Sequence, residues 1–345
     1  MCGYLMSDHK SGHRADMQPR PEERVSMKQR LACGILSTLI LLFVALEIVP
    51  GILSALIDEP VRNLCASLLG DEIGPGGLSL LHEYTGFIGI FVGSLALMAV
   101  VKPWRPYLKA FGTEASGNRP LMLALGLLIG FLTNGACVLV ACVMGNIQIE
   151  FKRFSPLGIA AFIVVVFIQC ATEELQARGF AYQRIKRTYN AKVAIIVSAC
   201  FFMVAHVFNS GVTPLALLNI FAIGVFYALL VHYCDSIWLP VGAHTAWNFT
   251  QNILFGLPNS GNASTYSIFG LVGTSTDGFA FDTAFGVEGT VVALMVNSLC
   301  VVVLLAWGRK HAKKELDIWE GKDAGVTPDK VRFYSGFGKL MTGFT

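Results

Sequence analysis

The sequence predicts an all-α, polytopic membrane protein with about eight transmembrane helices around a cavity in the helix bundle. Its 345 residues are 54% hydrophobic and only 14% charged, whereas about 25% of the residues of a soluble protein are charged. Apolar stretches of about 20 residues recur along the chain, each long enough to cross a hydrocarbon core of about 30 Å. A net charge of +3 gives no indication of a nucleic-acid partner. The nine cysteines are scattered, so they predict neither a disulfide framework nor a clustered zinc motif.

The apolar stretches define the predicted spans in order. They cover residues 31–56, 80–101, 121–145, 157–183, 193–209, 214–233, 236–255 and 288–307. The first and fourth contain polar interruptions, and the fifth is short for a span. We detect no internal repeat, so the inverted-repeat architecture of many transporters is not supported.

Lysine and arginine set the predicted orientation, because they concentrate on the cytoplasmic side of membrane proteins. Residues 1–30 carry six of them, 102–119 four, 184–192 four and 309–345 eight. The stretch 256–287 carries none. We therefore expect a multi-pass protein of the cell membrane with both termini in the cytoplasm.

This pattern divides the chain into segments. They are a disordered cytoplasmic tail (1–30), N-terminal transmembrane helices (31–155), a core (156–261), an external loop (262–287), a last transmembrane helix (288–308) and a basic cytoplasmic tail (309–345). The stretch 256–287, rich in Gly, Ser and Thr with interleaved aromatic residues, is interpreted as an external connector, with a partly ordered lid as the alternative.

Three ionisable residues interrupt the fourth span, in the sequence EELQAR. Such groups are costly inside a membrane and are candidates for function by default. Glu174 and Arg178 are four residues apart, so they share a helix face and can form an ion pair, which we interpret as mainly structural. Glu173 lies about 100° round the helix and cannot face Arg178 in the same way. We expect a functional role for Glu173.

Polar residues also interrupt the later spans. FMVAH ends with His206 in the fifth span, and Asn219 lies in the sixth. HTAWN places His244 and Asn248 in the seventh. Taken singly, the histidines would be satisfied interior residues, and the pair in the seventh span would be a helix–helix hydrogen-bonding face.

Their depths favour a shared site. Counted at 1.5 Å per residue from the basic ends, Glu173 lies about 16 Å deep and His206 about 21 Å. On the same count His244 lies about 14 Å deep and Asn248 about 20 Å. Residues at one level on three helices can meet in one cavity, so the sequence predicts a site within the bundle.

These side chains suit hydrolysis of an amide bond by water. Glu173 and His206 can hold and deprotonate a water molecule. His244 and Asn248 can donate hydrogen bonds to the developing oxyanion. No serine or cysteine is placed convincingly beside the histidines as a nucleophile. Zinc held by Glu173, His206 and His244 is the alternative, but the H-E-x-x-H spacing is absent, so we favour a site without a metal cofactor.

The stretch from Glu173 to Gly261 resembles the CPBP family of intramembrane proteases, also called the Abi or CAAX prenyl protease type-2 group, in its bacterial form. Three motifs carry the resemblance in the expected order: EExxxR as EELQAR, FxxxH as FMVAH and HxxxN as HTAWN. One motif alone would be weak, whereas three in order are specific. Residues 156–261 are therefore expected to form the protease core.

The resemblance implies an intramembrane endopeptidase that uses a glutamate mechanism on membrane-associated proteins or peptides. By the resemblance, the water-activating residues are Glu173 and His206, the oxyanion-stabilising residues are His244 and Asn248, and the supporting ion pair is Glu174 with Arg178. The expected partners are membrane lipid and the substrate, without nucleic acid. The alternative is a non-catalytic protein of the same fold that acts as a bacteriocin-immunity factor or partner-binding scaffold. The intact set of polar residues favours the enzyme.

Overall fold

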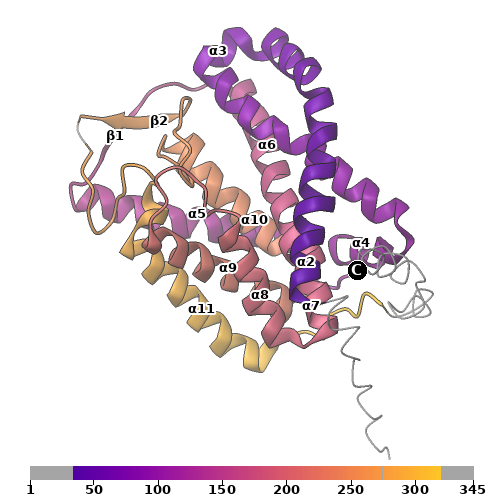
Figure 1. Cartoon of the computed structure of the whole chain (residues 1–345). Helices are drawn as coiled ribbons and strands as arrows, with labels where there is room; N and C mark the ends of the chain where they lie inside the picture. The colour runs from indigo at the N-terminus through magenta and orange to yellow at the C-terminus, as the bar shows by residue number, and fades with distance from the viewer. Residues whose placement is uncertain (1–33, 274, 320–345) are drawn as a thin grey trace, which may run out of the picture.

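Long apolar helices dominate this computed structural model, which describes residues 34–273 and 275–319 (Figure 1). Within these residues, five helical stretches are long and apolar enough to cross a membrane: Ile35–Val100, Pro120–Val143, Pro156–Thr188, Pro214–Cys234 and Val291–His311. The all-α, multi-pass architecture is therefore confirmed. The predicted tail 1–30 and residues 320–345 of the basic tail lie outside the described residues.

The elements follow one another with short connections. The α-helices are α2 (Ile35–Leu41), α3 (Val49–Val100), α4 (Arg105–Phe111), α5 (Pro120–Val143), α6 (Pro156–Glu174), α7 (Gln183–Thr188), α8 (Ala191–Val204), α9 (Pro214–Cys234), α10 (Trp238–Asn248) and α11 (Val291–His311). Three π-helical segments are η1 (Leu42–Ile48), η3 (Leu175–Tyr182) and η4 (Phe249–Leu254). The 3₁₀ turns are η2 (Lys102–Trp104) and η5 (Val287–Gly289), and the strands are β1 (Gln148–Phe151) and β2 (Phe269–Val272).

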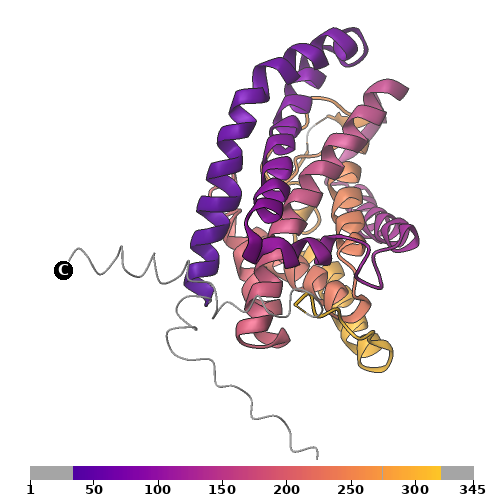
Figure 2. The same ribbon diagram turned by 90° about the vertical axis from the view of Figure 1, so that its right-hand side faces the viewer.

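The first two predicted spans form the two arms of a helical hairpin. Helix α3 bends at Gly74, whose φ of 67° is accessible to glycine at little cost. The segment 57–79, which lies between the first two predicted spans, is therefore helical and carries the bend. The arms pack side by side (Figure 2), so closely that a Cβ on Gly89 would lie 2.4 Å from the Cα of Ser54.

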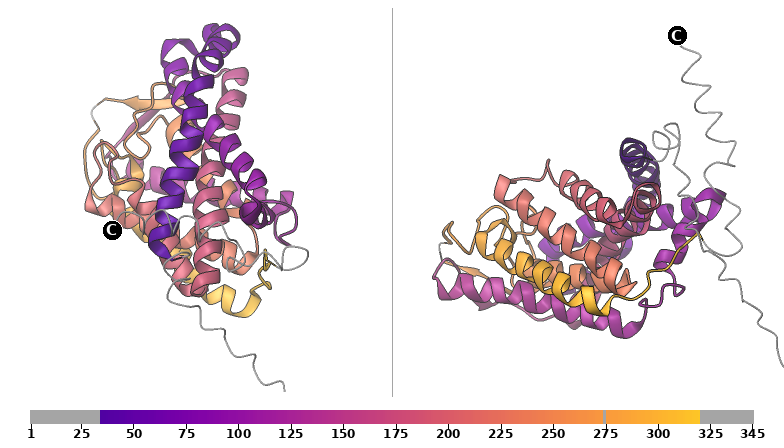
Figure 3. Two further views of the ribbon diagram at one scale, coloured as in Figure 1. Left: turned by 45° about the vertical axis from the view of Figure 1, so that its right-hand side comes forward. Right: turned by 90° about the horizontal axis from the view of Figure 1, so that it is seen from below.

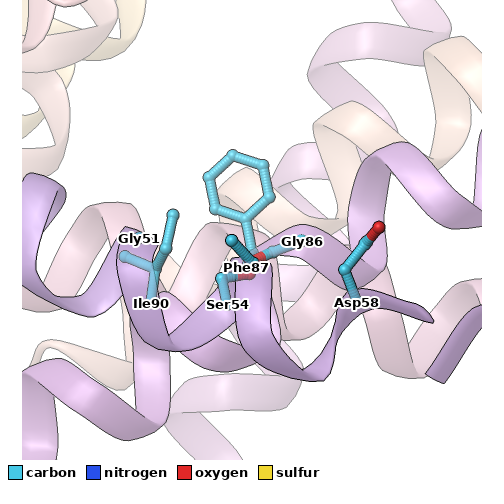
Figure 4. Close-up of a pocket in the computed structure, with 7 residues that line it drawn as sticks. Gly51, Ser54, Asp58, Gly86, Phe87 and Ile90 are labelled. Carbon is cyan, nitrogen blue, oxygen red and sulfur yellow. The ribbon is translucent and has the colours of Figure 1, made fainter. Parts of the chain in front are cut away.

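A groove of about 420 Å³ lies between these arms (Figure 4). Its lining residues are Gly51, Ser54, Ala55, Asp58, Gly86, Phe87 and Ile90. None of the predicted site residues belongs to this lining, so the groove is separate from the predicted site.

Helix α10 is the central helix of the bundle. Its residues from Leu239 to Asn248 are all buried, and it contacts α5, α6 and α9. Together with η4 it corresponds to the predicted seventh span, but protein rather than lipid surrounds it. Seen from below in the right panel of Figure 3, α5 and α11 lie along one side of the bundle and the N-terminal arm on the other.

Close backbone contact between α5 and α10 fixes the position of α10. A Cβ on Gly126 would lie 2.1 Å from the carbonyl oxygen of Leu239, and one on Gly130 would lie 2.0 Å from that of Ala243. These two glycines form a GxxxG pattern in an apolar helix, which lets two membrane helices approach closely. Because α10 carries two predicted site residues, this contact also positions the site.

The stretch 256–287 is more than a connector. Its strand β2 pairs antiparallel with β1, and Gln148 lies opposite Val272. Leu257, Phe281 and Phe285 are fully or almost fully buried against the bundle. Apolar side chains therefore anchor this connecting stretch to the helices, so it is more ordered than the sequence indicated.

Substitution of Gly130 by valine should separate α10 from α5. The added side chain meets backbone that cannot move aside, and overpacking of this kind costs about 1–3 kcal/mol. We expect Gly130→Val to lower the thermal unfolding temperature of the purified protein in detergent. Gly135→Val is the matched control on the same helix, because nothing lies within 4 Å of the point that its Cβ would occupy. Equal loss of stability in both variants would contradict the packing argument.

Candidate active site

The predicted ion pair is formed at the junction of α6 and η3. Arg178 Nη1 donates to Glu174 Oε1 at 3.0 Å, and both side chains are 0% exposed. Arg178 Nη2 donates to the carbonyl oxygen of Gly224 on α9 at 2.9 Å. The guanidinium carbon lies 4.6 Å from the ring centre of Phe202 on α8. This pair therefore ties α6, α8 and α9 together.

Glu174 also contacts a histidine on helix α10. His244 Nδ1 lies 3.2 Å from Glu174 Oε1. A carboxylate oxygen only accepts hydrogen bonds, so Nδ1 carries the hydrogen. His244 Nε2 consequently faces Glu173 Oε2 at 3.8 Å. The sequence assigned Glu174 only to the ion pair, whereas the structure shows that it also orients His244.

Glu173 has one oxygen free of hydrogen bonds. Its Oε1 accepts from Gln169 Nε2 at 2.5 Å. Its Oε2 is buried and has no hydrogen-bond partner among the described residues. The side chain as a whole is 18% exposed. This oxygen can therefore accept a hydrogen bond or a proton from a molecule that enters the site.

His206 lies beside this cluster rather than within it. Helix α8 ends at Val204, so His206 occupies the turn that follows. Its Nδ1 donates to the carbonyl oxygen of Phe202 at 2.8 Å, which leaves Nε2 as the basic nitrogen. The described residues show no direct hydrogen bond between His206 and Glu173, the two residues that we expect to hold a water molecule together. The ring of Phe202 instead packs between His206 and His244, with ring centres 4.9 and 5.7 Å away.

Asn248 belongs to the cluster and contacts Gln169, which the sequence analysis missed, and Cys170, which it did not favour as a nucleophile. Its Nδ2 donates to Gln169 Oε1 at 3.1 Å and to Cys170 Sγ at 3.5 Å, and lies 3.4 Å from His244 Nε2. Cys170 is fully buried. Gln169 and Cys170 precede Glu173 and Glu174 by four residues, so helical spacing was the signal that could have identified them.

A further carboxyl group approaches the site from the N-terminal arm. Gln176 Nε2 donates to the carbonyl oxygen of Leu46 in η1 at 2.9 Å. Glu47, the residue after Leu46, lies within electrostatic range of Glu173. Glu47 was visible in the sequence only as a polar interruption of the first span.

The geometry does not fit the alternative zinc site. The three proposed ligands were Glu173, His206 and His244. No group of three His, Cys, Asp or Glu side chains that could hold a metal ion occurs in the part of the chain that the structure describes. We therefore derive no chemistry through zinc on these residues.

Comparison with known proteins supports the resemblance inferred from the motifs. Residues 155–250 match the family model described as type II CAAX prenyl endopeptidase Rce1-like. This segment contains all six predicted site residues. No curated protein and no solved structure matches the chain significantly.

Removal of Arg178 should destabilise the protein. Arg178→Ala leaves Glu174 charged and buried, and breaking a buried pair in this way costs about 3–5 kcal/mol. Thermal unfolding in detergent should show a large loss of stability. The matched control is Arg62→Ala, which breaks an exposed pair with the same spacing to Asp58 and should cost less than about 1 kcal/mol. Normal stability of Arg178→Ala with loss of activity would instead assign Arg178 to substrate binding.

Proposed function

We propose, from the match of residues 155–250 to the type II CAAX prenyl endopeptidase family, that this multi-pass membrane protein hydrolyses peptide bonds of membrane-associated substrates with water activated by Glu173. The family match supports the reaction class, a protease. The observation that carries the assignment to Glu173 is its partner-free Oε2, held 3.8 Å from His244 Nε2 in the bundle.

In the proposed reaction, Glu173 is the general base. Its Oε2 accepts a proton from water while the water oxygen bonds to the carbonyl carbon of the substrate. The proton then passes from Glu173 to the leaving nitrogen as the carbon–nitrogen bond breaks, which regenerates the carboxylate. General-base assistance of this kind typically contributes about 10²–10⁴-fold to the rate. His206 would contribute its free Nε2 as a second acceptor for the water.

His244 and Asn248 supply the proposed oxyanion stabilisation. Glu174 fixes the orientation of His244, so the imidazole has one defined direction for Nε2. A protonated Nε2 would donate to the negative oxygen of the tetrahedral intermediate. Asn248 Nδ2 would donate to the same oxygen in place of its longer contact with Cys170 Sγ. One such donor is typically worth about 10²–10³-fold in turnover.

Cys170 is the competing nucleophile. It lies beside Asn248 in the cluster, and a cysteine paired with a histidine could attack the carbonyl directly. Its side chain is fully buried, however, and Sγ lies 3.5 Å from Gln169 Oε1 as a donor. The more exposed Glu173 is better placed to meet a substrate, which supports attack by water.

The non-catalytic scaffold remains the alternative from a different functional class. A scaffold would need the buried Glu174–Arg178 pair for stability, but not a carboxylate oxygen without a partner at Glu173. We also propose that both termini lie in the cytoplasm, as the stretches rich in lysine and arginine indicate.

Replacement of Glu173 should remove activity without unfolding the protein. Glu173→Gln keeps the shape and the hydrogen bond from Gln169 but cannot take a proton. Quantitative mass spectrometry of protein N-termini in membranes should therefore find termini made by the wild type that Glu173→Gln does not produce. Asn248→Ala should reduce these termini less.

Two further variants make this experiment decisive. Cys170→Ala should still generate the termini, because water rather than the thiol attacks. Glu83→Gln, at an exposed glutamate of α3, is the matched control and should resemble the wild type. Identical termini in wild type and Glu173→Gln would support the scaffold, and their loss in Cys170→Ala at normal abundance would support a cysteine mechanism.

A further inference from the structure

Glu288 is a buried acidic residue to which the proposed reaction assigns no role. It lies in η5, directly before α11, and is 7% exposed. Its backbone oxygen accepts a hydrogen bond from Asn219 Nδ2 on α9 at 2.9 Å. The Oδ1 of Asn219 in turn accepts from Asn297 Nδ2 on α11 at 3.0 Å. Two helices therefore hold Glu288 in one position, which also explains the intramembrane Asn219.

The side chain of Glu288 holds the segment 258–262. Its Oε1 accepts a hydrogen bond from the backbone N–H of Ser260. Ser260 has a φ of 51°, a left-handed conformation that is uncommon for a residue other than glycine and needs support from its surroundings. The buried carboxylate supplies that support at one end of the segment.

The same segment contacts the turn that carries His206. Asn209 Nδ2 donates to the carbonyl oxygen of Ser260 at 2.8 Å. The backbone N–H of Asn209 donates to the carbonyl oxygen of His206 at 3.1 Å. Hydrogen bonds therefore lead without a gap from Glu288 through Ser260 and Asn209 to the His206 turn.

Glycine at 261 allows this close approach. Gly261 has a φ of +89°, and a Cβ at this position would lie 2.2 Å from the carbonyl oxygen of Ser210. The backbone of the segment 258–262 thus lies directly against the turn. His206 lies beyond the end of helix α8, so helical hydrogen bonds do not hold its turn from both sides. The contact with the segment 258–262 therefore restrains this turn.

We propose that Glu288 is a positioning residue, which fixes the His206 turn through the segment 258–262 and so directs His206 Nε2 toward the site. The catalytic consequence rests on the proposed function, whereas the restraint on the turn does not. Loss of the restraint should free the turn, and with it the imidazole.

Hydrogen–deuterium exchange tests the restraint without a substrate. The full-length protein is purified in detergent, and exchange is followed by mass spectrometry in peptides that span 203–212. Glu288→Ala should accelerate exchange there by about tenfold, as expected for the loss of one hydrogen bond. Burial raises the pKa of Glu288 to about 7, so Glu288→Gln, a neutral acceptor of the same shape, should exchange like the wild type.

Two other variants separate positioning from general loosening. Asn209→Ala breaks the same connection at a less buried residue, so it should accelerate exchange over 203–212 even if Glu288→Ala does not fold. Asp282→Ala is the matched control, because Asp282 Oδ1 accepts from the N–H groups of Ala284 and Phe285 in the same stretch of chain, at 2.9 and 2.7 Å. It should leave exchange over 203–212 unchanged.

Turnover provides the second readout, with any substrate that the N-terminal mass spectrometry identifies. Glu288→Ala should lower kcat more than it raises KM, and Glu288→Gln should restore kcat. Wild-type exchange over 203–212 in a folded Glu288→Ala or in Asn209→Ala would overturn the proposal, as would equal acceleration in Asp282→Ala. One further outcome separates the two proposals. If exchange is accelerated in Glu288→Ala while wild type and Glu173→Gln give identical protein termini, the restraint on the His206 turn is supported. Only the proposed protease activity is then contradicted.

Discussion

The buried carboxylate of Glu174 is the constraint on which the rest of the structure depends. Its Oε1 receives hydrogen bonds from Arg178 and from His244, at 3.0 and 3.2 Å. Charges inside a bundle are tolerated only when they are paired and hydrogen-bonded, because each one loses its solvation by water. The continuous helix α6–η3 and helix α10 must therefore meet at this carboxylate in one arrangement. That arrangement leaves Glu173, at the preceding position of α6, with its Oε2 3.8 Å from His244 Nε2. Among the described residues this oxygen has no hydrogen-bond partner.

Close packing around Glu174 holds the surrounding helices in position. Gly126 and Gly130 bring the backbone of α5 into contact with α10, so that α10 runs through the centre of the bundle. Phe202 lies against the guanidinium of Arg178 and between the two imidazole rings. Close packing of this kind makes the site rigid, since none of these groups can move without displacing another.

Much of the site could be predicted from the sequence, because local spacing determined it. The spacing of four residues from Glu174 to Arg178 predicted their pairing, and three motifs predicted which helices contribute. The contact of Glu174 with His244 depends on the rotation of α6 relative to α10, which no local pattern encodes. The position of His206 depends on where α8 ends, and the apolar sequence FMVAH gives no stop signal there. The sequence GPGG at residues 74–77 contains the helix breakers that explain the bend, but it did not indicate that the residues on both sides of it are helical.

A double-mutant cycle between Glu174 and His244 tests the central claim most directly. The free energy of unfolding in detergent would be measured for wild type, Glu174→Met, His244→Leu and the double variant. The hydrogen bond between these residues predicts a coupling energy of about 1.5–3 kcal/mol, the range for hydrogen bonds to charged groups. Additive effects, with coupling below about 0.5 kcal/mol, would contradict the account, because the two residues would then not depend on each other.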